Sequence, residues 1–114
     1  GEDRRRVSAN APVKSISNET TFHDDTADPD ILDGHLWRLA EKVADRAKAR
    51  GRAGRVVTLK LKRADHRILT RRQSLGEPTQ IADRLYRTAR GLLDEAPRGP
   101  FRLIGVGLSD LAPA

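Results

Sequence analysis

The chain has 114 residues and carries 22 lysines and arginines against 16 acidic residues, which gives a formal charge of +6. It has no cysteine, so disulfides, thiolate metal sites and a cysteine nucleophile are excluded and a reducing compartment is expected. No apolar run approaches the roughly 20 residues of a membrane-spanning helix, and the length suits one domain. The basic balance favours an anionic partner, with nucleic acid first and an anionic membrane surface second, although an arginine-rich proteome would give the same balance.

The N-terminal part predicts a linker, a strand and a loop. The first residue is glycine rather than methionine, so we expect a piece of a longer protein. Residues 1–13 carry consecutive arginines and no apolar period, which predicts a basic linker. Residues 14–22 predict a strand on which Ser15, Ser17, Glu19 and Thr21 share a polar face. The acidic, proline-containing sequence that follows predicts a loop.

Two segments have the apolar period of amphipathic helices. The first, 30–50, is preceded by Asp28 and Pro29, which suit the start of a helix. The second, 79–96, can be capped by Thr79, after 76–78 end the preceding strand. The apolar stripes are Leu32, Leu36, Leu39, Ala40, Val43 and Ala47 in the first helix and Ala82, Leu85, Tyr86, Ala89, Leu92 and Leu93 in the second.

A hairpin over 55–75, with its turn at 64–66, lies between the helices, and a last strand is predicted over 101–109. In the first hairpin strand Lys60 and Lys62 lie opposite the apolar positions, whereas the return strand leaves both parities open. The resulting β-α-β-β-α-β order predicts an α+β fold, in which two helices cover one face of a four-stranded antiparallel sheet and the other face stays open.

The excess positive charge lies on the hairpin, where lysines and arginines over 52–72 face Asp65 as the one acid, whereas both helices are nearly neutral. An open, basic, hydroxyl-rich face suits a phosphate backbone. Two alternatives remain. Lys60 and Lys62 could instead protect an edge strand from aggregation, and Gly105 and Gly107 could either admit a large ligand or relieve crowding.

The sequence contains no motif that supports a catalytic role. The histidines lack metal-ligand spacing, and no nucleophile–base pair is present. A ferredoxin-like enzyme would need such a constellation. An RNA-recognition-type module would need aromatic residues on its central strands, but the four aromatics, Phe22, Trp37, Tyr86 and Phe101, lie outside the hairpin strands.

Three segments in order resemble the little finger, or polymerase-associated, domain of Y-family translesion DNA polymerases, in their bacterial polymerase IV branch. These are KSISNETTF with its acidic loop, VTLKLKRADHRILTRRQSL and FRLIGVGLSDL. The resemblance covers 14–111 and implies that 1–13 is the linker from the thumb and 112–114 a C-terminal tail. Ser17 and Asn18 depart from the family, which often has Gly-His or Gly-Arg there, and some relatives carry a basic residue at the position of Gly107.

The resemblance implies a non-catalytic domain that binds primer-template DNA in the major groove, independently of sequence, and supports lesion bypass and processivity. It implies no cofactor here, since Mg²⁺ and its carboxylates belong to the parent's palm. Implied partners are the thumb, palm and fingers, and a sliding clamp in the bacterial cytoplasm. In the family the usual clamp-binding peptide lies beyond this domain at the extreme C-terminus, so it is expected to be absent from the sequence up to Ala114. Docking on the clamp is the alternative main task. The DNA contacts implied by the resemblance are Lys14, Ser15, Ser17, Thr21, Lys60, Lys62, Thr70, Arg71, Arg72, Ser74 and Arg102.

Overall fold

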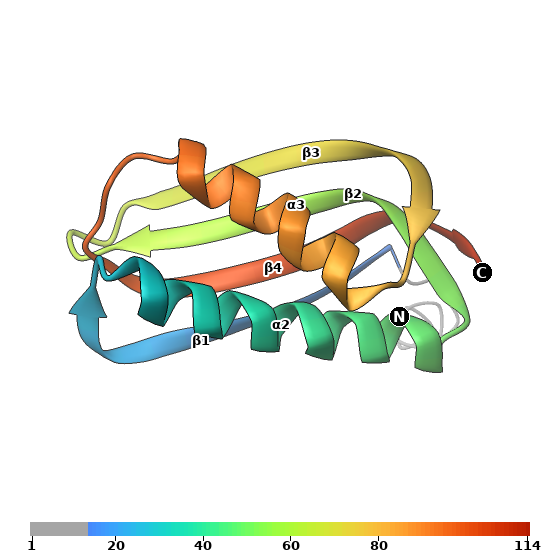
Figure 1. Cartoon of the computed structure of the whole chain (residues 1–114), viewed down its shortest axis with the longest axis horizontal. Helices are drawn as coiled ribbons and strands as arrows, with labels where there is room; N and C mark the ends of the chain where they lie inside the picture. Colours follow the sequence, from blue (N-terminus) through green and yellow to red (C-terminus); the bar gives the residue numbers. More distant parts are fainter. Residues whose placement is uncertain (1–13) are drawn as a thin grey trace, which may run out of the picture.

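The computed structural model describes residues 14–114, and its elements follow the predicted β-α-β-β-α-β order (Figure 1). The α+β class is therefore confirmed, while the linker predicted over 1–13 lies outside the described residues. Within the described part, no helix is long and apolar enough to cross a membrane. The elements are β1 (Ser15–Thr26), α2 (Pro29–Ala49), β2 (Arg52–Arg63), β3 (Ile68–Thr79), α3 (Ala82–Glu95) and β4 (Phe101–Pro113).

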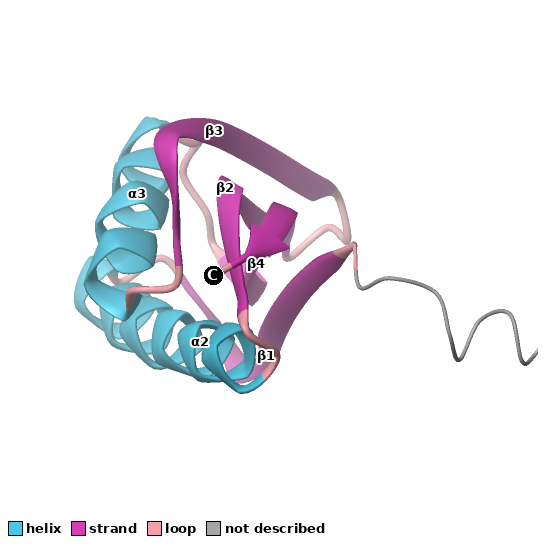
Figure 2. Cartoon of the chain, turned by 90° about the vertical axis from the view of Figure 1, so that its right-hand side faces the viewer, coloured by secondary structure: helices cyan, strands magenta, loops and turns pink. Residues whose placement is uncertain are grey.

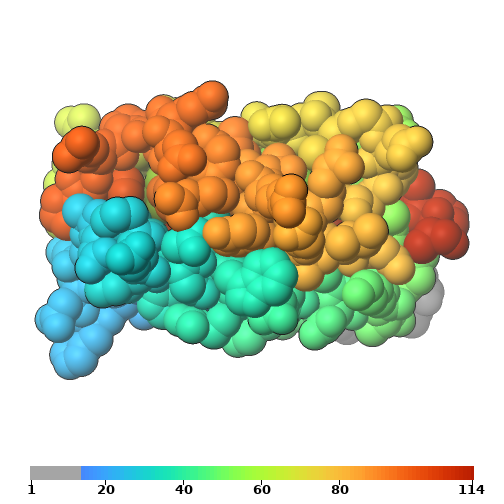
Figure 3. Space-filling view, in the orientation of Figure 1, coloured from blue at the N-terminus to red at the C-terminus, as the bar shows by residue number. Residues whose placement is uncertain are grey.

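The strands form one antiparallel sheet in the order β1-β4-β2-β3, and both helices pack on the same face of it (Figures 1 and 2). In the space-filling view of this side, α2 and α3 cover most of the sheet (Figure 3). β2 lies between two neighbouring strands, so Lys60 and Lys62 are on a central strand. This position excludes edge protection as their role, because only β1 and β3 have a free edge.

The apolar core lies between the helices and the sheet. The stripe predicted for the first helix is buried along its length, from Leu32 to Ala47. In α3 the predicted stripe is buried at Leu85, Ala89 and Leu92 and partly buried at its other positions. The sheet contributes Ile16, Val57, Leu59, Leu61, Leu75, Phe101, Ile104, Val106 and Leu108.

The start of α2 follows the predicted chemistry. The Asp28 carboxylate accepts a hydrogen bond of 2.9 Å from the backbone N–H of Asp30, and Pro29 occupies the first turn. At the other end the chain turns at Gly51, whose φ of 64° is a conformation that glycine adopts without steric cost.

The prediction that 76–78 end the return strand is wrong. β3 continues to Thr79, which pairs with Gly54 of β2. Proline is tolerated at position 78 because β3 is an edge strand, where an N–H on the free side is not required. Thr79 also does not cap the helix. Its Oγ1 accepts a hydrogen bond of 3.1 Å from the N–H of Ile81, the residue before α3 begins at Ala82.

The last strand is longer than predicted. Ala112 and Pro113, placed by the sequence in a tail, continue β4 and pair with Ala53 and Arg52 of β2. The backbone N–H of Ala114 donates to the carbonyl of Gly51 over 2.9 Å. β2 and β4 therefore contact each other up to the last described residue.

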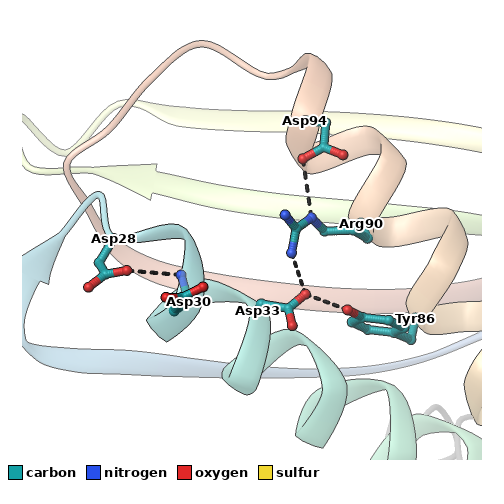
Figure 4. A network of polar contacts seen from close by, with 6 residues as sticks. All are labelled: Asp28, Asp30, Asp33, Tyr86, Arg90 and Asp94. Atoms are coloured by element: carbon teal, nitrogen blue, oxygen red, sulfur yellow. Dashed lines mark hydrogen bonds and ion pairs between the residues drawn. The ribbon is translucent and has the colours of Figure 1, made fainter.

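A polar network connects the two helices (Figure 4). The Asp33 carboxylate of α2 accepts hydrogen bonds from the Tyr86 hydroxyl and the Arg90 guanidinium of α3, and Arg90 also pairs with Asp94 over 3.2 Å. The hydrogen bond from Tyr86 lowers the pKa of Asp33 most, and Arg90 lowers it further, against an opposing effect of burial. The same hydrogen bond raises the pKa of Tyr86.

We expect Asp33→Asn to remove part of the acid sensitivity of folding. Because the folded-state pKa of Asp33 is lowered, its stabilisation is fully present above the unfolded value of about 3.9 and is lost as the pH falls through the folded value. Urea unfolding from pH 7 towards about pH 2 should show the wild type converging on the variant. A difference that stays constant with pH would contradict this role. The control Asp83→Asn removes an exposed pair within α3 and should change stability little.

Candidate nucleic-acid interface

Four cross-strand rows form the face of the sheet that the helices leave uncovered, called here the open face. Alternation along each strand produces it, because the intervening side chains, such as Ile16, Leu59 and Ile104, are buried against the helices. Each row runs through β1, β4, β2 and β3. The rows are Ser15–Ser109–Val56–Ser74, Ser17–Gly107–Thr58–Arg72, Glu19–Gly105–Lys60–Thr70 and Thr21–Leu103–Lys62–Ile68.

The middle of the open face is a shallow hollow of about 420 Å³, lined by hydroxyl and charged residues of all four strands and by Gly105 and Gly107. A Cβ at Gly105 would lie 3.0 Å from the Cβ of Glu19, and one at Gly107 would lie 3.5 Å from the Cβ of Ser17. Relief of crowding is therefore a real role of Gly105. The absence of side chains at both positions also keeps the hollow open.

Most of the predicted contact residues come together on this face. The register decides the parity of the return strand, which the sequence left open, since Arg72 lies opposite Thr58 and Thr70 lies opposite Lys60. Lys14 directly precedes β1 and is exposed, outside the rows. The predicted residues within the rows are Ser15, Ser17, Thr21, Lys60, Lys62, Thr70, Arg72 and Ser74.

Two further predicted contact residues lie outside the four rows. Arg71 lies opposite the fully buried Leu59, so it has the helix-side parity, and its guanidinium donates to the carbonyl of Thr70 over 3.1 Å. Arg102 lies where the pairing of β2 with β4 shifts register, which interrupts the alternation. Its side chain approaches Asp25 at 3.6 Å and the ring of His66 at 3.1 Å.

The sequence model of the impB/mucB/samB family C-terminal domain matches residues 13–114. The chain belongs to this family. A DNA polymerase IV of Caulobacter vibrioides is 49% identical over 115 residues, which cover 100% of this chain and 28% of that protein. The chain thus spans little more than a quarter of the length of this curated relative.

Solved structures agree with the family. A Y-family polymerase chimera, Dbh-Dpo4(243-245)-Dbh, has a TM-score of 0.77 at 18% identity, over 91% of this chain and 30% of that chain, which shows the shared fold. The little finger domain of PolIV, solved in a complex with the beta-clamp processivity factor, has a TM-score of 0.68 at 25% identity, over 88% of this chain and 91% of that one. The predicted resemblance to the little finger of Y-family polymerases is confirmed.

The charges of this little finger are not distributed evenly over the open face. Lys60 Nζ lies 3.1 Å from Glu19 Oε1. By contrast, no ion pair joins Lys62 or Arg72 to another of the residues 14–114. In the same range, no group of three or more acidic or histidine side chains could hold a metal ion. Within residues 14–114, the cations of the open face without an ion-pair partner are therefore Lys62 and Arg72, which lie in the rows on either side of the Glu19–Lys60 pair.

The predicted DNA contacts omit Thr58, Ser109 and Glu19, although all three lie on the open face. Alternation along the sequence does predict that Thr58 shares the face of Lys60 and that Glu19 shares the face of Ser17. Alternation does not predict the contact between Glu19 and Lys60. It depends on the sheet order, which places β1 two strands away from β2.

Proposed function

We propose that the domain binds the phosphate backbone of primer-template DNA in the major groove through its open face, as part of a translesion DNA polymerase. The single observation that carries this proposal is the set of rows itself, where hydroxyl groups and the cations Lys60, Lys62 and Arg72 share one uncovered surface. Hydroxyls and cations contact phosphates without reading bases. The binding is therefore independent of sequence, and it supports lesion bypass and processivity.

The composition of the rows also favours DNA backbone over stacked single strands. Modules that bind unpaired bases use aromatic side chains as stacking surfaces. None of the residues in the four rows is aromatic, and Phe101 at the start of the central strand β4 is buried in the core. We therefore expect duplex DNA to be the preferred ligand.

Other parts of the polymerase complete the proposal. The chain corresponds to about a quarter of its curated polymerase relative, and we assign nucleotidyl transfer and its Mg²⁺ to the palm of the parent protein, in the bacterial cytoplasm. This domain then contributes DNA binding and no catalytic step. Thumb, palm and fingers are its partners within the parent protein.

A second candidate function is docking on a sliding clamp. It is supported by the PolIV little finger that was solved in a complex with the beta-clamp, to which this chain is 25% identical. Docking through a sheet edge or the helical side is compatible with DNA binding by the open face. The two functions differ in their ionic-strength dependence, because phosphate contacts weaken steeply with salt.

Fluorescence anisotropy of the domain with two duplexes of unrelated sequence tests the DNA proposal. Between about 50 and 200 mM salt, the logarithm of the binding constant should fall linearly with the logarithm of salt, by about 0.9 for each neutralised phosphate. With Lys62 and Arg72 as the free cations and Lys14 beside β1, we expect a slope between about −2 and −3. Both duplexes should bind equally. No binding at low salt would count against the proposal and favour docking on a sliding clamp. A strong preference for one sequence would count against binding through the phosphate backbone alone.

A further inference from the structure

Glu19 is an unexpected residue on a surface that binds phosphate. Among the residues of the four rows it is the one acid, and it lies in the third row, next to the hollow. Its carboxylate accepts a hydrogen bond from Lys60 Nζ over 3.1 Å. Both side chains remain accessible, at 50% for Glu19 and 41% for Lys60. A negative group therefore lies where a DNA phosphate would contact Lys60.

The sheet is built so that this pair can form. Glu19 is on β1 and Lys60 is on β2, and β4 runs between them. Both residues pair with Gly105, so the two side chains meet above a position that has no side chain of its own. A Cβ at that position would lie only 3.0 Å from the Cβ of Glu19. The Asn18 side chain also accepts a hydrogen bond of 2.9 Å from the backbone N–H of Glu19.

We propose that Glu19 is a built-in competitor of the DNA phosphate for Lys60, an inference that rests on the DNA-binding function proposed above. In the absence of DNA, the carboxylate of Glu19 forms an ion pair with the ammonium group of Lys60, and the pair has no net charge. A phosphate that approaches Lys60 has to displace the carboxylate and still remains beside its negative charge. The pair therefore releases few counterions from DNA, and the domain binds more weakly than its lysines and arginines suggest.

The competitor gives the open face a neutral centre between two positive flanks. Lys62 lies in the next row on one side and Arg72 in the next row on the other. The backbone of bound DNA is therefore held at the flanks and can leave the centre without loss of an ion pair. Such a surface holds DNA less tightly than one in which all three cations are without a partner.

Glu19→Gln tests the proposal, since it removes the charge and keeps the shape. With Lys60 released, one more phosphate can be neutralised. We expect binding to a duplex to tighten about threefold to eightfold at about 0.1 M salt, and the salt slope to steepen by about 0.9. The matched control is Glu41→Gln, which raises the net charge equally on the exposed surface of α2. It should leave the affinity unchanged.

Two further variants complete a double-mutant cycle with Glu19→Gln. Lys60→Ala leaves Glu19 unpaired beside the phosphates and should weaken binding. The double variant Glu19→Gln with Lys60→Ala replaces a neutral pair by neutral groups, and it should bind within about twofold of the wild type. Thermal unfolding of each variant checks that the fold is retained, as the exposure of both side chains predicts.

The outcomes separate this inference from the function on which it rests. If Glu19→Gln leaves binding unchanged, the carboxylate does not compete with the phosphate, and the competitor proposal is wrong. If it weakens binding equally for all sequences, Glu19 positions Lys60, and the proposal is again wrong. If Glu19→Gln weakens binding to some DNA sequences more than to others, the carboxylate of Glu19 accepts a hydrogen bond from the amino group of a base. The competitor proposal is then also wrong. In each of these cases DNA binding by the wild type stands. Absence of wild-type binding at low salt overturns the function and the inference together.

Discussion

Replacing Lys62 and Arg72 together by alanine is expected to weaken duplex binding by about tenfold to fiftyfold at about 0.1 M salt, and to reduce the salt slope by nearly 2. These are the two cations of the open face that have no ion-pair partner within 14–114. Each should therefore neutralise one phosphate. Anisotropy titrations over a salt series measure both quantities.

The control for this double variant removes the same charge from the helical side. Arg38 and Lys42 are exposed on α2, which packs on the opposite face of the sheet. Arg38→Ala with Lys42→Ala should change duplex affinity less than twofold. A loss as large as that of the open-face variant would mean that DNA contacts the helices, and it would reverse the assignment of the face.

Leu85→Asp is expected to unfold the domain rather than to impair DNA binding selectively. Leu85 is fully buried in α3, in the core between helix and sheet. Truncation of such a leucine to alanine costs about 2–5 kcal/mol, and an unpaired buried charge adds several more. The sum approaches the whole stability of an ordinary domain, about 5–15 kcal/mol. Circular dichroism should show no cooperative thermal transition.

Arg84→Asp is the matched control for Leu85→Asp. It introduces the same acid one residue earlier, at an exposed position of α3. It should keep a cooperative transition, with a midpoint within a few degrees of the wild type. A Leu85→Asp variant that unfolds at the wild-type temperature would contradict the core assigned to α3.

The order of helices and strands, their apolar stripes and the basic sheet face could be predicted because each follows from a local period. For β3, a local period did not suffice to predict which side chains lie on which face of the sheet. An edge strand has little apolar alternation, and over 68–74 only Leu69 and Arg71 are even partly buried, so its parity became clear only from its pairing with β2. For this reason the sequence leaves the face of Arg71 open, and its pairing opposite the buried Leu59 gives it the helix-side parity.

Two other features depend on neighbours that are distant in the sequence. Where the pairing between β2 and β4 shifts register, the side chain of Arg102 contacts Asp25 and His66. No pattern in the sequence of the last strand predicts this shift. Likewise, the charge of Lys60 could be read from the sequence, but its neutralisation by Glu19 requires two strands to flank Gly105. Register and strand order are tertiary properties, and the site depends on both.

The central position of β4 has a consequence for biosynthesis. Of the four described strands, β1 is synthesised first, yet within residues 14–114 it pairs only with β4, which is synthesised last. Until β4 is available, β1 has no partner in the sheet, and β2 is paired with β3 on one side and open on the other. The long sequence separation of these contacts predicts slow folding after synthesis of the whole domain, and nascent chains that end before β4 would expose strand edges to aggregation.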